Sequence, residues 1–316
     1  MYKYRIYPSL LDKFQDYLDY QIQAEMPWNK VSEAAHARGE YLDKAVGDYI
    51  LSPDEVAERI EVELINSINR CPKEPNEAAD AGTCFNEVVD CLIHKRKPLN
   101  NDIKVQTLRR EDGTPVCIEA RLNGFTFNFD LALCRQMAEY YRGALSQYML
   151  NAPIDTQHGK VELYGYADEW LGDSIFDIKT TSAYDFPKFE RKTQRLVYPY
   201  CAVKSGLIAD IDYFEYTVIK WSKNNRDVIY KPRTYSDGVD NTNDYERLEP
   251  HEITIWRGDM YQEIYSYTHD VDTERLRLIV ERFIEWLEYR REYITDSKIF
   301  GGENSENYQG TKIENL

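Results

Sequence analysis

The chain has 316 residues, which is long enough to bury a substantial core in one large domain or two modest ones. Its formal net charge of −16 excludes a protein that binds nucleic acid over its whole surface, although a single basic groove stays compatible with it. No run of about 18 apolar residues is present, and the first ten residues lack the apolar core of a signal peptide, so we expect a soluble cytoplasmic protein without a membrane partner.

The first 100 residues are predicted to be mainly helical. Ser9 is placed to cap a helix whose apolar side chains recur at helical spacing through Leu18. Residues 29–50 have a polar helical pattern, and Ser52-Pro53-Asp54-Glu55 is a capping box that opens another helix. A further helix starts at Gly82-Thr83. We expect these helices to have a structural role, with their apolar faces packed in the core.

Two short strands and a helix are predicted next. Strands over 116–122 and 125–129 are joined by Asn123-Gly124, a strong hairpin signal. Residues 130–150 then have apolar side chains at helical spacing, which predicts one long amphipathic helix.

The central stretch, residues 161–181, has the pattern of a two-stranded hairpin. Polar and apolar side chains alternate over 161–171, and Asp168 comes at the end of the polar face. Gly172-Asp173 is a turn signal, and the next strand, 174–181, has Asp177 and Lys179 two apart on one face. We therefore expect two carboxylates and an ammonium to come together.

Such a cluster has two interpretations. A surface hairpin with an ordinary cross-strand ion pair is common. Alternatively, Asp168 and Asp177 are oxygen ligands of Mg²⁺ or Mn²⁺, and Lys179 positions an attacking water. Burial of three charges for packing alone makes little sense, because each must be compensated. The second interpretation is the one that we develop.

A helix is predicted to follow, with Asp185 as its cap and Pro187 in its first turn, and to continue to about Val203. Gln194 and Tyr198 are four apart and so share a face of this helix. Four basic residues on the same segment are candidate partners of a phosphate backbone. They are Lys188, Arg191, Lys192 and Arg195.

The C-terminal third completes the expected sheet. Residues 210–220 form a strand that is apolar on both faces, 222–227 a turn, 228–231 and 252–256 short strands, 235–249 a polar loop and 273–293 a closing helix. Residues 1–299 are thus predicted to form one α/β domain, with a helical lobe over 1–100, a core over 101–299 and a disordered tail over 300–316.

These residues resemble the motifs of the PD-(D/E)XK nuclease superfamily, and within it the RecB-like and phage-type exonucleases. The matching set is Asp168 at the end of a strand, Asp177-Ile178-Lys179 on the next strand, and Gln194 with Tyr198 on the following helix. The resemblance implies a restriction-endonuclease-like core, in which a central mixed sheet is flanked by helices.

The resemblance also implies roles for single residues. Asp168, Asp177 and the Ile178 carbonyl would hold the metal, Lys179 and Gln194 would be catalytic, and Thr180 would contact nucleic acid. Tyr198 would either stack on a base or, as we expect, pack beneath the helix.

One position departs from the family. Its Gly-Thr helix carries a metal-binding histidine where this chain has Asn86, a weaker ligand. Glu87 or Asp90 would supply the missing charge, unless both simply face solvent.

The six cysteines form no C-x-x-C pair, which argues against zinc and disulfide frameworks. Some RecB-like nucleases hold an iron–sulfur cluster through cysteines near the C-terminus. Because no cysteine follows Cys201, we do not expect that cofactor here.

The function implied is a Mg²⁺- or Mn²⁺-dependent exonuclease of bacterial, prophage or phage origin. It would act on linear duplex or single-stranded DNA ends in recombination or repair, and the resemblance implies a single-strand annealing protein as its partner. Two alternatives stay open: an endonuclease of the same superfamily, and an inactive nucleic-acid-binding protein on the same scaffold.

Overall fold

The computed structural model describes residues 2–24, 41–43, 48–49, 53–232 and 248–301. The helices in these ranges are α1 (Pro8–Ala24), α3 (Pro53–Ile68), α4 (Glu77–His94), α5 (Leu131–Tyr140), α6 (Gln194–Lys204) and α7 (His269–Tyr289), with short 3-10 turns at Arg291–Tyr293 and Ser297–Ile299. The strands are β1 (Tyr4–Ile6), β2 (Tyr41–Asp43), β3 (Asp48–Tyr49), β4 (Lys104–Arg109), β5 (Pro115–Leu122), β6 (Phe125–Asp130), β7 (Leu145–Thr156), β8 (Gly159–Leu171), β9 (Ser174–Thr181), β10 (Tyr213–Pro232) and β11 (Leu248–Tyr265).

One large mixed sheet organises the described chain. Its strands follow the order β1-β8-β9-β10-β11-β6-β5-β4, and β7 pairs with β8 outside this path. The contacts β1–β8, β9–β10 and β11–β6 are parallel, whereas the other pairs are antiparallel. The predicted α/β class with a central mixed sheet flanked by helices is therefore confirmed.

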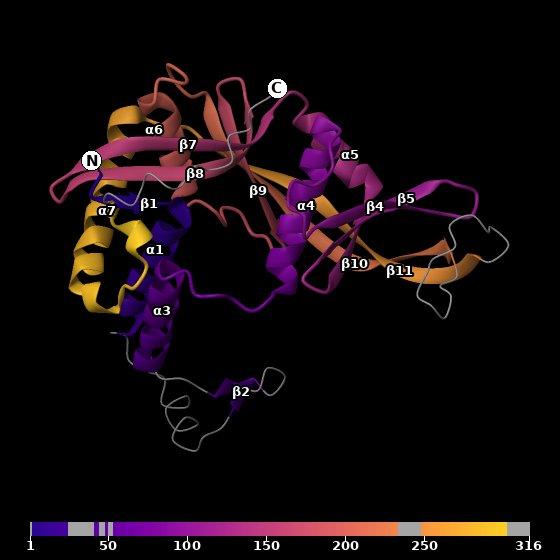
Figure 1. Ribbon diagram of the computed structural model, residues 1–316, viewed down its shortest axis with the longest axis horizontal. Helices are drawn as coiled ribbons and strands as arrows, with labels where there is room; N and C mark the ends of the chain where they lie inside the picture. The colour runs from indigo at the N-terminus through magenta and orange to yellow at the C-terminus, as the bar shows by residue number, and fades with distance from the viewer. Residues whose placement is uncertain (1, 25–40, 44–47, 50–52, 233–247, 302–316) are drawn as a thin grey trace.

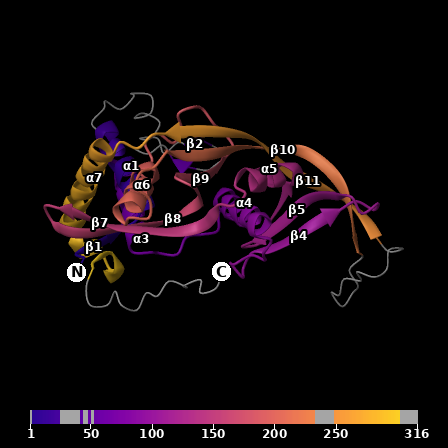
Figure 2. The ribbon, with the colours of Figure 1, turned by 90° about the horizontal axis from the view of Figure 1, so that it is seen from above.

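Helices cover both faces of this sheet (Figures 1 and 2). One apolar cluster joins α1, α3, α6 and α7 to β7, β8 and β10, and a second joins α4 and α5 to β5 and β6. Strand β9 contributes Ile175 to the first cluster and Phe176 and Ile178 to the second, as expected for successive side chains on opposite faces of a strand. The helices of the first 100 residues are thus divided between the two faces.

A gap in the strand pairing lies along β8. On one edge β8 pairs with β7 along most of its length, but on the other edge it pairs with β1 at Val161–Leu163 and with β9 only at Glu169–Leu171. Over residues 164–167 the described chain pairs β8 with β7 alone, and Asp168 is left out of the register with either neighbouring strand. Strands β8 and β9 therefore separate just beyond the Gly172 turn, and side chains rather than backbone groups occupy the space between them.

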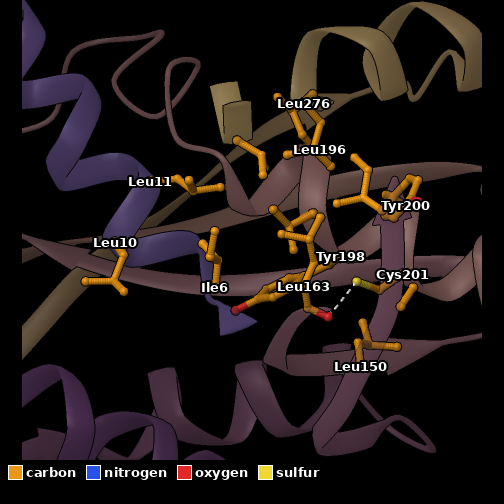
Figure 3. Close-up of a cluster of buried hydrophobic side chains, with 14 of the residues drawn as sticks. Ile6, Leu10, Leu11, Leu150, Leu163, Leu196, Tyr198, Tyr200, Cys201 and Leu276 are labelled. Carbon is orange, nitrogen blue, oxygen red and sulfur yellow. Dashed lines mark hydrogen bonds between the residues drawn. The ribbon is translucent and has the colours of Figure 1, made fainter. Parts of the chain in front are cut away.

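Helix α6 packs against β8 at this gap. The ring of Tyr198 lies so close to Gly165 that a Cβ there would be 2.6 Å from its Cε1 atom. Tyr198 is buried among Ile6, Leu163 and Leu196 in the core between α1, α6 and β8 (Figure 3). Glycine at this position lets the helix approach the strand closely.

Several predicted elements differ in extent, and three of them bear on the site. The helix predicted over 130–150 ends at Tyr140, because Gly143 (φ +85°) interrupts it and β8 offers a long antiparallel ladder to Leu145–Thr156. The helix predicted from Asp185 begins only at Gln194. The turn predicted over 222–227 is a register shift between Ser222 and Asn225 inside one long strand, β10.

Several predictions fall partly or wholly outside the described residues. Three regions are concerned: most of the polar helix predicted over 29–50, the part of the predicted loop at 233–247, and the tail at 302–316. Within 29–50 the described pieces are the strands β2 and β3. At the start of the predicted tail, Phe300 forms a β-bridge with Tyr4, and the N–H of Gly301 donates to the Lys3 carbonyl. None of the described helices is both long and apolar enough to cross a membrane.

Candidate active site

Three of the predicted catalytic side chains meet in one hydrogen-bonded group. Lys179 Nζ lies 2.5 Å from Asp177 Oδ2 and donates to Gln194 Oε1 at 2.8 Å. Gln194 Nε2 in turn donates to Asp177 Oδ1 at 2.5 Å. The strand β9 supplies the acid and the amine, and the first residue of α6 supplies the amide that bridges them.

Asp168 joins this group from β8, across the gap between the strands. Its Oδ2 atom accepts the backbone N–H of Ile178 at 2.7 Å and the side-chain amide of Asn86 at 3.3 Å, and its Oδ1 atom accepts from Gln147 at 3.3 Å. The separation of β8 and β9 frees the Ile178 N–H for this contact. The structure therefore brings Asp168, Asp177, Lys179 and Gln194 together, as the sequence pattern predicts.

The electrostatics of the group are those of two acids held close to one buried amine. Burial and the neighbouring Asp177 raise the pKa of Asp168 to about 7. Burial also raises the pKa of Asp177, although Lys179 and Gln194 oppose the shift. Burial alone would lower the pKa of Lys179, but Asp177 and Asp168 outweigh it and raise that pKa, so the amine is a cation at neutral pH.

A residue that sequence reasoning missed fixes the start of α6. Asp12 of α1 is buried, and its Oδ1 atom accepts the backbone N–H of Thr193 at 2.6 Å and the Thr193 hydroxyl at 2.8 Å. Thr193 makes no capping bond through its own side chain. Asp12 thus replaces the missing cap and positions Gln194, and nothing in the local sequence of α1 marks it out.

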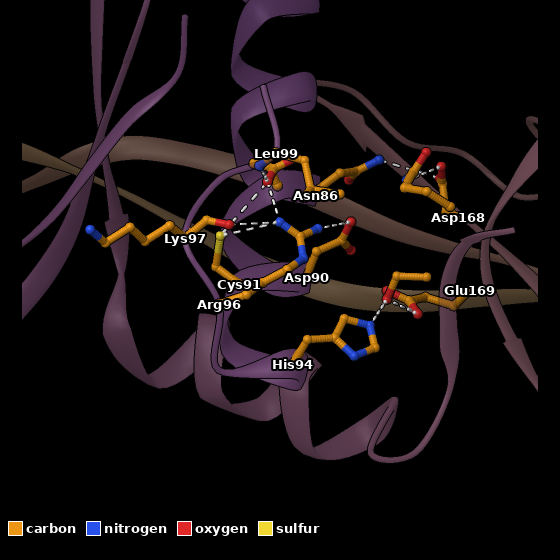
Figure 4. Close-up of polar contacts among 12 residues, drawn as sticks. Asn86, Asp90, Cys91, His94, Arg96, Lys97, Leu99, Asp168 and Glu169 are labelled. Atoms are coloured by element: carbon orange, nitrogen blue, oxygen red, sulfur yellow. Dashed lines mark hydrogen bonds and ion pairs between the residues drawn. The ribbon is translucent and has the colours of Figure 1, made fainter. Parts of the chain in front are cut away.

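One face of α4 lies beside Asp168 and Glu169 of β8 (Figure 4). Gly82, Asn86, Asp90 and His94 are spaced four residues apart and so lie on one face of the helix. A Cβ at Gly82 would be 3.0 Å from the hydroxyl of Thr180, which explains the glycine at this approach to β9. Asn86 contacts Asp168, and His94 Nε2 lies 2.7 Å from the Ser146 hydroxyl.

Asp90 belongs to a second acid pair, with Glu169 of β8. The two carboxyl groups interact electrostatically: burial and Asp90 raise the pKa of Glu169 to about 9, and burial raises the pKa of Asp90 to about 6. Arg96 neutralises Asp90 at 3.2 Å, and Ser146 donates to Glu169 at 2.8 Å. One proton shared between the two acids keeps this pair close to a single negative charge at neutral pH.

Glu87, the other predicted contributor from α4, points away from Asp168. Its Oε1 atom accepts from Arg96 at 2.6 Å and from the backbone N–H of Leu99 at 2.7 Å. Asn86 is therefore the side chain of α4 that reaches Asp168, whereas Glu87 fixes the chain that follows the helix.

The oxygen atoms around Asp168 fit a hard divalent cation. Asn86 Oδ1 and Asp177 Oδ2 are buried and accept no hydrogen bond of ordinary geometry, although Lys179 Nζ lies beside the latter. Two carboxylates, an amide oxygen and the nearby Ile178 carbonyl form a donor set of the kind that Mg²⁺ and Mn²⁺ prefer. Among the described residues, no group of three or more histidine, cysteine, aspartate and glutamate side chains is arranged to hold a metal, so such a site would depend on the amide and backbone oxygens.

The predicted basic residues are mostly paired with acids or carbonyls. Lys188, Arg191 and Lys192 lie in the loop before α6 rather than on a helix. Arg191 pairs with Asp19 at 2.6 Å, and Lys192 lies 3.7 Å from Asp16.

Arg195 and Tyr198 are buried, and neither faces solvent. Arg195 donates to the Glu190 carbonyl at 2.7 Å and stacks on Tyr265. Tyr198 packs against Gly165, the role that we expected. Lys188 donates to Thr181, the last residue of β9, at 2.6 Å. It is exposed, and of the four predicted cations it lies nearest in sequence to the end of β9.

The loop that carries Lys188 is held in place by a buried acid of β11. Glu263 accepts the backbone N–H groups of Lys188 and Phe189 at 2.9 and 3.0 Å, and Tyr265 donates to it at 2.7 Å. Two backbone donors on one carboxylate fix the loop beside the site.

Comparisons with known proteins add little to this geometry. No family model and no curated protein matches the chain. Among solved structures, the chain is similar to one described as "Crystal structure of SSO0001", with 14% sequence identity and a TM-score of 0.27. The match covers 54% of this chain and 64% of that one, so it spans less than two thirds of the matched protein.

Proposed function

We propose that this protein is a metal-dependent deoxyribonuclease with a core of the PD-(D/E)XK type. The observation that carries the proposal is the convergence of Asp168, Asp177, Lys179 and Gln194, four side chains from two strands and a helix, on one buried polar group. An ordinary surface ion pair would need neither burial nor the amide bridge, and it would not raise the pKa of Asp168 to about 7.

Each residue has a role in phosphodiester hydrolysis. Asp168, Asp177, the Ile178 carbonyl and the Asn86 amide oxygen would hold Mg²⁺ or Mn²⁺, which supplies a water of lowered pKa and neutralises charge on the phosphate. Lys179 orients the attacking water and opposes the negative charge that develops on the phosphoryl oxygens. Gln194 holds the Lys179 ammonium at 2.8 Å, and so limits the positions that it can adopt.

The neighbouring groups support these roles. Asp12 anchors the first turn of α6, and through it Gln194. Glu87 and Asp90, which the sequence marked as further ligands, instead compensate Arg96 and leave Asn86 as the donor from α4. We assign phosphate contacts to Thr180 of β9 and to Lys188 and Lys192 of the loop before α6.

The substrate that we propose is DNA with a free end, as in phage-type and RecB-like exonucleases that act in recombination or repair. A bacterial, prophage or phage origin and a single-strand annealing partner belong to the same proposal. Its basis is the ordered motif from Asp168 to Tyr198.

The test is a titration of Mg²⁺ and Mn²⁺ against a linear duplex and the same duplex closed into a circle. An exonuclease degrades only the linear form, and an endonuclease of the same superfamily cuts both. Protein with Lys179→Ala, prepared in parallel, controls for contaminating nuclease. Binding of DNA without cleavage at any metal concentration would instead identify an inactive binding protein and contradict the proposal.

A further inference from the structure

A basic cavity lies between α1, α3 and the chain that follows α3. Its volume is about 270 Å³. Its lining consists of Tyr7, Ser9, Leu10, Lys13, Ser67, Arg70, Cys71 and Lys73. Three of these residues are cations and none is an acid, in a chain whose net charge is −16. The lining therefore presents only positive charge to the cavity, although Asp296 pairs with Arg70, and Glu63 and Asp16 lie near Lys13.

Two of the cations are held against each other. Lys13 Nζ donates to the Ser67 hydroxyl, and the charge of Lys73 lies close enough to lower the pKa of Lys13. Burial and Lys73 together lower the pKa of Lys13 to about 8, although Glu63 and Asp16 nearby oppose the shift. Holding two ammonium groups together costs free energy, and an anion between them would recover it.

The third cation, Arg70, occupies a strained backbone position. It follows the last turn of α3 with φ +54°, a conformation that normally selects glycine or asparagine. Its Nε atom pairs with Asp296 at 2.6 Å, and one terminal nitrogen lies 3.5 Å from the Tyr164 hydroxyl. These two contacts hold the guanidinium beside the cavity that Arg70 lines.

From these contacts we propose that the cavity between α1 and α3 binds a phosphate group. Lysine ammonium groups and an arginine fork are the standard protein ligands of phosphate, and the first turn of the 17-residue helix α1 adds Ser9 and its own positive dipole. The occupant is either free phosphate or a phosphate of a nucleic-acid strand.

The position of the cavity favours the strand, an assignment that rests on the proposed function. Tyr164, which contacts Arg70, lies four residues before Asp168 on β8. At about 3.3 Å per residue, these two positions are roughly 13 Å apart. A strand whose scissile phosphate lies at Asp168 would therefore extend along β8 and place another phosphate in the cavity.

The experiment is calorimetric titration of the full chain in EDTA, so that cleavage does not contribute. The probes are inorganic phosphate and an eight-residue oligothymidylate, with and without a terminal phosphate. The variants are Lys73→Ala, whose side chain is exposed, and Arg70→Gly, which removes a cation from a backbone position that glycine adopts without strain. Lys95→Gly is the matched control, because Lys95 is also exposed, has φ +51° and lies outside the cavity.

We expect each cavity variant to weaken binding about tenfold, as for the loss of one charged hydrogen-bonding partner, and Lys95→Gly to bind like the wild type. Binding of free phosphate identifies a small-anion site. Binding of the oligonucleotide alone identifies a strand phosphate, and dependence on the terminal group identifies a chain end.

The proposal is overturned if the wild type binds none of the probes, or if both cavity variants bind as tightly as the wild type. Failure of the nuclease activity leaves the result intact, because phosphate binding is measured without cleavage. If the wild type cleaves DNA yet binds none of the probes, the nuclease proposal stands and the phosphate-binding proposal fails.

Discussion

Two buried pairs of carboxyl groups each take one member from β8, at the adjacent residues Asp168 and Glu169, and they are held in different ways. Asp168 and Asp177 come from separating strands, and their compensating charge, Lys179, lies two residues from Asp177. Asp90 and Glu169 come from a helix packed on a strand, and Arg96 and Ser146 compensate them. Each pair keeps one buried oxygen without an ordinary hydrogen bond, Asp177 Oδ2 in the first and Glu169 Oε1 in the second. The first oxygen lies beside the Lys179 ammonium, whereas the second pair shares a proton.

The difference shows that burial of acids is not in itself a sign of catalysis. A pair that satisfies its charge with an arginine and a shared proton is a structural element. A pair that is compensated by one lysine, with amide and backbone oxygens around it, can bind a metal cation in place of the ammonium. The ammonium is then free to contact a phosphate. The experiments below test whether the two pairs differ in this way.

The largest expected effect is on cleavage by Lys179→Ala. Removing the ammonium takes away the group that opposes transition-state charge, and we expect the cleavage rate to fall roughly 10³-fold. Affinities for Mg²⁺ and DNA should change little, because Asp168 and Asp177 remain. Single-turnover kinetics with Lys160→Ala, a surface lysine on the same sheet, as control measure the effect. Cleavage at the wild-type rate would refute the role of Lys179.

The second expected effect is the pH dependence of Mg²⁺ binding. With the pKa of Asp168 near 7, the cation competes with a proton below that pH. Affinity should therefore rise about tenfold per pH unit up to pH 7 and then level off. Calorimetry measures the profile, which Asp177→Asn should abolish and Glu169→Gln should preserve. A profile that is flat between pH 5 and 8 would show that Asp168 does not hold the metal.

The third expected effect is on stability, through Arg96→Met at the second pair. The change keeps the aliphatic volume but leaves Asp90 and Glu87 without their cation, so the free energy of unfolding should fall by about 2 kcal/mol. Urea unfolding at pH 7 measures it. Arg59→Met is the control, since the exposed Arg59–Glu63 pair should contribute less than about 0.5 kcal/mol. Equal losses for both variants would mean that the second pair has no structural role.

The smallest expected effect is a gain in stability for Glu169→Gln. The pKa of Glu169 is about 9 in the folded protein and about 4.5 in the unfolded chain. Between these two pH values the folded protein therefore holds a proton that the unfolded chain has released. Wild-type stability therefore falls as pH rises from 4.5 to 9, whereas the amide has no proton to lose. Glutamine should match the wild type at pH 4.5 and become increasingly the more stable of the two as the pH rises towards 9. A constant difference across this range would contradict the shared proton.

Much of the site follows from local sequence pattern. Alternation over 161–171, the Gly172-Asp173 turn and the two-residue spacing of Asp177 and Lys179 predict β8, β9 and their hairpin, because strand geometry is a local property. The four-residue spacing of Gln194 and Tyr198 predicts a shared helical face for the same reason.

The remaining features depend on contacts between distant residues. Asp185 and Pro187 form a good local start signal, yet α6 begins at Gln194 because Asp12, 181 residues from Thr193, supplies the cap. Leu145 and Tyr148 fit a helical stripe as well as a strand, and pairing with β8 decides between them. The ion pair between Arg191 and Asp19 likewise cannot be predicted from the local sequence, because the two residues are far apart in the chain.

Gly165 has a consequence for how the catalytic parts are assembled. The missing side chain sets the depth at which Tyr198 rests on β8, and the same helix presents Gln194 one turn earlier. Three residues further along the strand stands Asp168. The strand β8 thus supplies Asp168 and also sets the distance to Gln194, the group that orients Lys179. A methyl group added at Gly165 would therefore disturb the catalytic geometry without touching any reacting atom.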